Sequence, residues 1–266
     1  MPSRPVSLAS SIAAARSRPR RAPKRLRRVL LAALLILLLL PPGLLLVYRF
    51  LPVPLTPLMV IRLLEGEALK RRWVRLDQVA PVLPQAAVAA EDNRFCEHSG
   101  FDWQEIEGQI DALLAGERAR GASTITMQTA KNLFLWPGRD FVRKALEAWL
   151  TSQIELLWPK RRIMEVYLNV AELGPGIYGA EAAAQAYFGK PASGLTLQEA
   201  ALLAAILPSP RSWSPARPTD YLQGRARTIR TRIGQLGPML DCLRPGSLRA
   251  PLGSGAAQRT VAAFAA

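Results

Sequence analysis

Two segments of the chain gather side chains that could do chemistry. The first, Glu91–Asp102, surrounds the only histidine with carboxylates, and the second, Gly121–Asn132, is small and polar and carries a lysine near its end. A carboxylate can take a proton as a general base, and a cation can stabilise an anion that develops during a reaction. Together the two segments predict a group-transfer site.

Glu91 is the first candidate for the base. It follows the apolar run Val88-Ala89-Ala90, so we expect its carboxylate at the edge of a low-dielectric wall, where the pKa of a carboxyl group rises. The alternative is an ordinary solvated carboxylate or an ion pair with Arg94. Residue types alone leave both interpretations open.

His98 and the two cysteines invite other chemistry that the sequence supports poorly. A single histidine cannot form a histidine-rich metal site, and no serine has the context of a nucleophile elbow, so we expect a structural hydrogen bond at His98. Cys96 lacks a supporting constellation for a nucleophile. Cys96 and Cys242 could pair in an oxidising compartment, but they are far apart in the chain and nothing in the sequence brings them together, so we expect two unpaired, mostly buried thiols.

Lys131 and Arg139 enclose an apolar loop that contains Phe134 and Trp136. Two cations that converge on one point would suit a diphosphate, and the apolar residues between them would suit a lipid surface. The alternative is a plain loop with solvated cations. Glu147 is spaced from Arg143 as in an ordinary surface salt bridge on a helix, which favours a structural role for it on spacing alone.

The N-terminal region differs from the rest of the chain. Nine basic residues and no acid occur in residues 4–28, within a chain of net charge +15, and the uncharged run 29–48 follows at once. Such a run spans roughly 30 Å as a helix, enough to cross a bilayer. We expect a basic cytoplasmic tail (1–28) beside anionic lipid and a transmembrane anchor (29–48), with Pro41-Pro42 kinking it. A cleaved signal peptide is the alternative.

Positive charge on the cytoplasmic side would place everything after Arg49 outside the cytoplasm, in a periplasm or beyond the cell. Nucleic acid is a poor partner, because the basic cluster precedes the apolar run. The remaining pattern predicts an all-α domain, since no stretch alternates like a strand. We expect helices at 85–90, 102–115, 140–158, 160–169, 181–188 and 196–207, a flexible turn opening at Gly121, and a fading signal after Gln223.

Six motifs then occur in one order: ED-x-x-F-x-x-H-x-G-x-D (91–102), GASTIT-x-Q-x-x-KN (121–132), RK-x-x-E (143–147), RI-x-E-x-YLN (162–169), GPGIYGAEAAAQAYFGK (174–190) and LTLQEAALLAAILPSP (195–210). In this combination the chain resembles the peptidoglycan glycosyltransferase family, which polymerises lipid II in bacterial cell-wall synthesis and includes a domain of class A penicillin-binding proteins. The resemblance covers about residues 65–235. Without Ser-x-x-Lys and Lys-Thr-Gly signatures, it implies the monofunctional form.

The resemblance implies a lysozyme-like helical domain (49–235) with a small apolar lobe facing the membrane, and a C-terminal tail (236–266). It implies Glu91 as the general base, and Lys131 with Arg139 on the diphosphate of the donor. Glu147 would be a second catalytic carboxylate on the diphosphate side. The residues expected to line the donor site are Ser123, Gln128 and Asn132.

The family implies no obligatory cofactor, although Glu147 could act through a divalent metal, Mg²⁺ or Mn²⁺. The implied partners are lipid II, the lipid-linked glycan chain, the membrane and other cell-wall synthesis proteins. One departure is Met127, where many members carry a second glutamine before Gln128. The alternatives are a lysozyme-like hydrolase or lytic transglycosylase, in which Glu91 would break the glycan, and an inactive scaffold.

Overall fold

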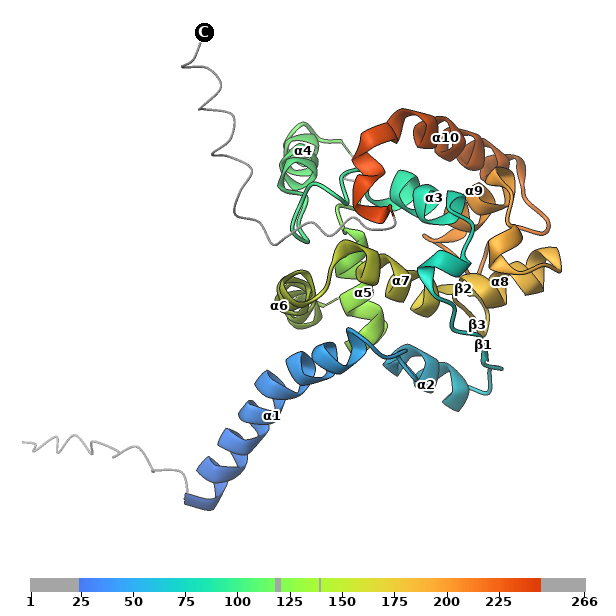
Figure 1. The fold of residues 1–266 in the computed structure, drawn as a ribbon. Helices are drawn as coiled ribbons and strands as arrows, with labels where there is room; N and C mark the ends of the chain where they lie inside the picture. Colours follow the sequence, from blue (N-terminus) through green and yellow to red (C-terminus); the bar gives the residue numbers. More distant parts are fainter. Residues whose placement is uncertain (1–23, 118–120, 139, 245–266) are drawn as a thin grey trace, which may run out of the picture. The chain divides into compact units, whose positions relative to one another are not determined.

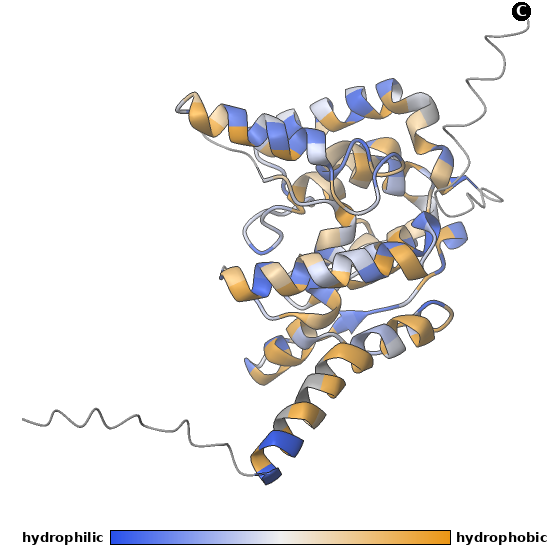
Figure 2. Ribbon diagram, turned by 90° about the vertical axis from the view of Figure 1, so that its left-hand side faces the viewer, coloured by the Kyte–Doolittle hydropathy of each residue, from blue (hydrophilic) through white to orange (hydrophobic). Residues whose placement is uncertain are grey.

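The computed structural model describes residues 24–117, 121–138 and 140–244 (Figure 1). The chain divides into two compact units, Met1–Leu40 and Pro41–Ala266. The described part of the first unit is helical and belongs to α1, Lys24–Tyr48, which contains Pro41 and Pro42. In Figure 2 the start of α1 is hydrophilic and its later turns are largely apolar.

Among the described residues, no helix meets the length and hydropathy expected of a membrane span. The anchor at 29–48 therefore stays a prediction. Most of the predicted basic tail (1–28) and of the C-terminal tail (236–266) lies outside the described residues.

The described chain is predominantly helical, as predicted. Beyond α1 the α-helices are α2 (Pro57–Leu64), α3 (Val82–Glu91), α4 (Trp103–Leu114), α5 (Ile125–Phe134), α6 (Phe141–Leu157), α7 (Lys160–Val170), α8 (Ala180–Phe188), α9 (Leu197–Ile206) and α10 (Asp220–Leu236). The 3₁₀ helices are η1 (Leu76–Gln78), η2 (Ala192–Gly194) and η3 (Gly237–Leu243).

A small sheet corrects the all-α prediction. Strands β1 (Lys70–Arg71), β2 (Glu172–Gly174) and β3 (Ile177–Tyr178) pair in the order β1-β3-β2, with β1 parallel and β2 antiparallel to β3. Strands of two or three residues are too short to show an alternating pattern. The turn into β3 needs Gly176, because its φ is +67° and a Cβ there would lie 2.1 Å from the Ala68 carbonyl oxygen.

Helix α9 forms the centre of one half of the fold. Its residues 200–206 are all buried, and α3 and α10 pack against it. A helix that is apolar on every side must be covered on every side. Helix α10 was missed from the sequence, because its exposed face is rich in arginine and its buried positions are few: Leu222, Ala226, Ile229 and Leu236. The helical signal therefore extends to Leu236 rather than fading after Gln223.

Helices α5, α6 and α7 form the other half. Helix α5 packs against both α6 and α7. The turn expected at Gly121 is short, and α5 already begins at Ile125. The Thr124 hydroxyl caps this helix by accepting from Met127 N–H at 3.2 Å. Asp102 and Asp140 cap α4 and α6, because their carboxylates accept from the backbone N–H groups of Glu105 and Arg143.

The two cysteines correct another prediction. Cys96, in the loop after α3, and Cys242, in η3, form a disulfide with a Cα–Cα distance of 5.5 Å. The sequence could not bring them together, because η3 returns only after α10 has crossed the fold. In the structure α10 leads η3 back against α7, so the bond ties the end of the described domain to the loop that follows Glu91.

We expect loss of this bond to destabilise the domain. A cross-link over a long loop restricts the unfolded chain, and removal of a native disulfide costs about 2–5 kcal/mol. Thermal unfolding of Cys96→Ser, Cys242→Ser and the double variant, with and without reductant, measures the effect. The double variant should be no less stable than the singles, and reductant should act on the wild type alone. Equal stability of wild type and double variant would contradict the assignment.

Candidate active site

Glu91 is the last residue of α3, and its side chain is 14% exposed. Its Oε2 accepts a hydrogen bond from Gln128 Nε2 of α5 at 2.9 Å, and its Oε1 lies 3.5 Å from Arg225 Nη2 of α10. Burial raises the pKa of the Glu91 carboxyl, while Gln128, Arg225 and Lys131 oppose the rise. The predicted rise in pKa therefore agrees with the structure.

The alternative partner for Glu91 was Arg94, and that alternative is wrong. Arg94 instead pairs with Glu97 at 2.9 Å and with Asp102 at 3.2 Å. The arginine that faces Glu91 comes from α10, more than a hundred residues later in the chain. Arg225 reaches Glu91 because α10 packs against α3.

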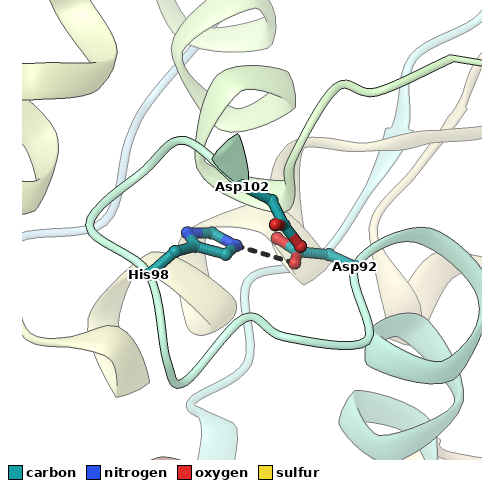
Figure 3. A group of neighbouring side chains, drawn as sticks. All are labelled: Asp92, His98 and Asp102. Carbon is teal, nitrogen blue, oxygen red and sulfur yellow. Dashed lines mark hydrogen bonds and ion pairs between the residues drawn. The ribbon is translucent and has the colours of Figure 1, made fainter. Parts of the chain in front are cut away.

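The loop after Glu91 is held by a buried polar cluster (Figure 3). His98 Nε2 lies 2.8 Å from Asp92 Oδ1, and Gly100 N–H donates to His98 Nδ1 at 3.1 Å. Since Nδ1 accepts, the ring proton belongs on Nε2 and points to Asp92. The second oxygen of Asp92 accepts from Ile125 N–H at 2.9 Å. The structural role predicted for His98 is confirmed.

Asp92, His98 and Asp102 are the only described residues that group like metal ligands, but their bonding does not fit an ion. Both oxygens of Asp92 are engaged, and both ring nitrogens of His98 are engaged. Asp102 Oδ1 accepts from Glu105 N–H and Arg94. The cluster instead joins the loop after Glu91 to the first turn of α5, through the two oxygens of Asp92.

Glu147 is buried on α6, so the expectation of an ordinary surface salt bridge is wrong. Its Oε2 accepts from Arg143 Nη1 at 2.8 Å, and its Oε1 accepts from Lys144 Nζ at 2.6 Å. The same Lys144 ammonium donates to Ser123 Oγ at 3.2 Å. Because cations occupy both oxygens, the surroundings of Glu147 do not fit a divalent metal.

Lys131 lies half-buried on α5, near the carboxylates of Glu91 and Glu147. Burial lowers the pKa of its ammonium, while Glu147 and Glu91 raise it. The Lys131 ammonium forms no hydrogen bond with another described residue, which leaves its N–H groups available to an anion. Arg139, its predicted partner, lies outside the described residues.

Two cavities meet at Gln128. The larger, about 900 Å³, is lined by Glu91, Ser123, Gln128 and Arg225, among others. The smaller, about 290 Å³, is lined by Gln128, Lys131, Asn132 and Trp136 with residues of α2 and the β2 region. The predicted site residues that the structure describes thus lie on α5 or beside it. Glu147 lies on α6, which packs against α5. Met127, the departure from the family pattern, is buried in the core and lines neither cavity.

Sequence reasoning missed three residues of this site. Arg225 and Arg232 of α10 line the larger cavity, and Tyr167 of α7 donates to Gln128 Oε1 at 3.2 Å. The two arginines stand seven residues apart, a spacing that puts them on one face of a helix. The spacing could have predicted that the two arginines share a surface, but only if residues 220–236 had first been predicted to form a helix.

The raised pKa of Glu91 predicts a stability effect. The folded state then binds the proton more readily than the unfolded chain, so above the raised pKa the buried carboxylate lowers stability. Below the ordinary value of 4.5 both states are protonated and the penalty vanishes. Glu91→Gln should therefore unfold at a higher temperature than wild type at about pH 8, with the gap closing by about pH 4. Exposed Glu107→Gln is the control, and a destabilised Glu91→Gln at high pH would contradict the expectation.

Comparison with known proteins agrees with this geometry. The family model described as Transglycosylase matches residues 59–233. The biosynthetic peptidoglycan transglycosylase of Rhodospirillum centenum is 59% identical over 187 residues, covering 70% of this chain and 81% of the relative. Its namesake in Caulobacter vibrioides is 50% identical over 220 residues, covering 82% and 96%. That of Bdellovibrio bacteriovorus is 53% identical over 202 residues, covering 74% and 81%.

The family-model match runs from α2 into α10 and contains every described residue of the site. The chain belongs to the transglycosylase family.

Proposed function

We propose that this protein is an inverting peptidoglycan glycosyltransferase that polymerises lipid II into β-1,4-linked glycan strands and releases polyprenyl diphosphate. The observation that carries the proposal is the position of Gln128, which lines the cavity of the buried carboxylate Glu91 and also the cavity of the free ammonium of Lys131. A base and an anion-binding cation thus flank one point, as a transfer between two bound sugars requires.

In this mechanism Glu91 takes the proton from the 4-hydroxyl of the acceptor sugar. The freed oxygen forms a bond to the anomeric carbon of the donor, and the bond from that carbon to the diphosphate breaks with inversion. The diphosphate leaves with the bonding pair, and Lys131 stabilises its charge. We assign Arg139 to the same anion from the sequence, and we assign Ser123, Gln128 and Asn132 to the sugar and phosphate oxygens of the donor.

Glu147 acts in this proposal by holding cations. Its carboxylate keeps Arg143 and Lys144 beside Lys131 and so offsets their mutual repulsion. No step passes through a metal, because the groups around Glu147 are cations. Mg²⁺ or Mn²⁺ at the substrate diphosphate stays an untested expectation.

We further propose that the protein works at the outer face of the bacterial plasma membrane, with its N-terminus in the cytoplasm. The lipid substrate requires a membrane, and the uncharged run 29–48 offers an anchor. The Cys96–Cys242 disulfide supports an oxidising compartment such as the periplasm. Exposed apolar side chains of α2, Leu63 and Leu64, support a membrane-facing lobe. Other cell-wall synthesis proteins are the expected partners.

A lysozyme-like hydrolase or lytic enzyme is the second candidate, since a buried glutamate with a raised pKa also suits a general acid. Such an enzyme acts on finished glycan and needs no cation for a diphosphate. The half-buried ammonium of Lys131, without a hydrogen-bonded partner among the described residues, favours synthesis.

We expect Glu91→Gln to abolish most polymerisation. Glutamine keeps the shape but cannot accept a proton, and loss of a general base costs about 10²–10⁴-fold in rate. Polymerisation of labelled lipid II in detergent, read on gels, measures the loss, and Glu107→Gln is the matched control. Wild-type rates in Glu91→Gln would remove Glu91 as the base, and no polymer from folded wild type would favour an inactive scaffold.

Lys131→Ala distinguishes synthesis from hydrolysis. Removal of a preorganised cation from a developing anion costs about 10²–10³-fold, so lipid II polymerisation should fall by that amount while the protein stays folded. Wild type and variant are also incubated with purified glycan strands, which neither should cleave. Cleavage of glycan that survives Lys131→Ala would establish the hydrolase instead.

A further inference from the structure

Tyr167 is a buried group that the proposed mechanism does not use. Its side chain is 0% exposed, and its hydroxyl donates to Gln128 Oε1 at 3.2 Å. Burial and the nearby carboxylates hold the pKa of Tyr167 well above its usual value, so the phenol stays protonated. It is therefore a permanent hydrogen-bond donor inside the fold.

The amide of Gln128 can be placed in two orientations of nearly equal shape. With its nitrogen toward Glu91, the amide donates to the carboxylate, as observed at 2.9 Å. With its oxygen toward Glu91, it would oppose the anion and favour the protonated acid. The direction of one side-chain amide thus decides which form of Glu91 the site prefers.

The Tyr167 hydroxyl decides that direction. Its hydrogen needs an acceptor because it is buried, and Gln128 Oε1 is the acceptor that the structure provides among the described residues. If the amide turned over, the phenol hydrogen would face an N–H group and lose its bond. We propose that Tyr167 is a positioning residue whose hydroxyl fixes the Gln128 amide so that its N–H faces Glu91. The inference rests on the proposed function of Glu91 as base.

The other charged groups near Glu91 do not replace this effect. Arg225 of α10 faces the opposite oxygen at 3.5 Å, Lys131 of α5 acts through space, and Asp92 opposes ionisation. None of them contacts the amide oxygen of Gln128 through a hydrogen bond in the described part of the chain. Within the described part of the chain, Tyr167 alone links this oxygen to α7.

Tyr178→Phe provides a matched control for Tyr167→Phe. Tyr178 is also 0% exposed, but its hydroxyl has no hydrogen-bond partner among the described residues. Both variants remove one buried phenolic oxygen, and only one of them should disturb Gln128.

The test measures lipid II polymerisation by the full chain in detergent as a function of pH. In Tyr167→Phe the acid limb of kcat should move to higher pH, with kcat down roughly two- to tenfold on that limb and KM unchanged. Tyr178→Phe should follow the wild-type profile. In a Gln128→Leu background, Tyr167→Phe should have no further effect, because its action passes through the amide. An unshifted limb in Tyr167→Phe, or additive losses in the double variant, would overturn the proposal.

A second measurement separates this inference from the proposed function. NMR titration of the Glu91 carboxyl carbon, assigned with Glu91→Gln, reports its pKa without turnover. The pKa should be higher in Tyr167→Phe than in wild type and in Tyr178→Phe. If wild type makes no polymer, the function fails while this shift still decides the role of Tyr167, and equal titration in all three proteins refutes it.

Discussion

The site depends on the buried carboxylate of Asp92. One of its oxygens accepts from Ile125 N–H in the first turn of α5, and the other holds His98. A carboxylate at a helix N-terminus satisfies an otherwise unpaired N–H group and favours the helix dipole. The bond joins the end of α3, where Glu91 lies, to the start of α5, one turn before Gln128. The contact thus holds together the two helix ends that carry the proposed base and its amide partner.

Around this contact the fold buries charged side chains, at least in part. Glu91 is mostly buried, Lys131 is half-buried, and Glu147 is buried with two cations on its oxygens. Electrostatic interactions gain strength in such surroundings, and burial raises the pKa of the Glu91 carboxyl. Burial of charge lowers the stability of the fold, and the buried apolar residues of α7 and α9 offset this loss.

Much of the fold could be predicted because local rules decide it. The helices α4, α6 and α9 begin at Asp102, Asp140 and Thr196, whose side chains cap them, and these signals are visible in the sequence. The sheet and α10 escaped prediction for opposite reasons. The strands are too short to carry a period, and α10 carries so many arginines that its apolar stripe is narrow.

By itself the sequence determined the largely helical class and the order of the motifs, because residue types and their spacing along one segment are local properties. The family resemblance carried by those motifs then gave the candidates Glu91, Lys131 and Glu147. Only the tertiary structure decided what these residues touch. Arg225 reaches Glu91, Tyr167 reaches Gln128, and Cys96 meets Cys242 across long stretches of chain. Such contacts follow from how α3, α5, α7 and α10 pack, and packing depends on the shapes of all the buried side chains at once.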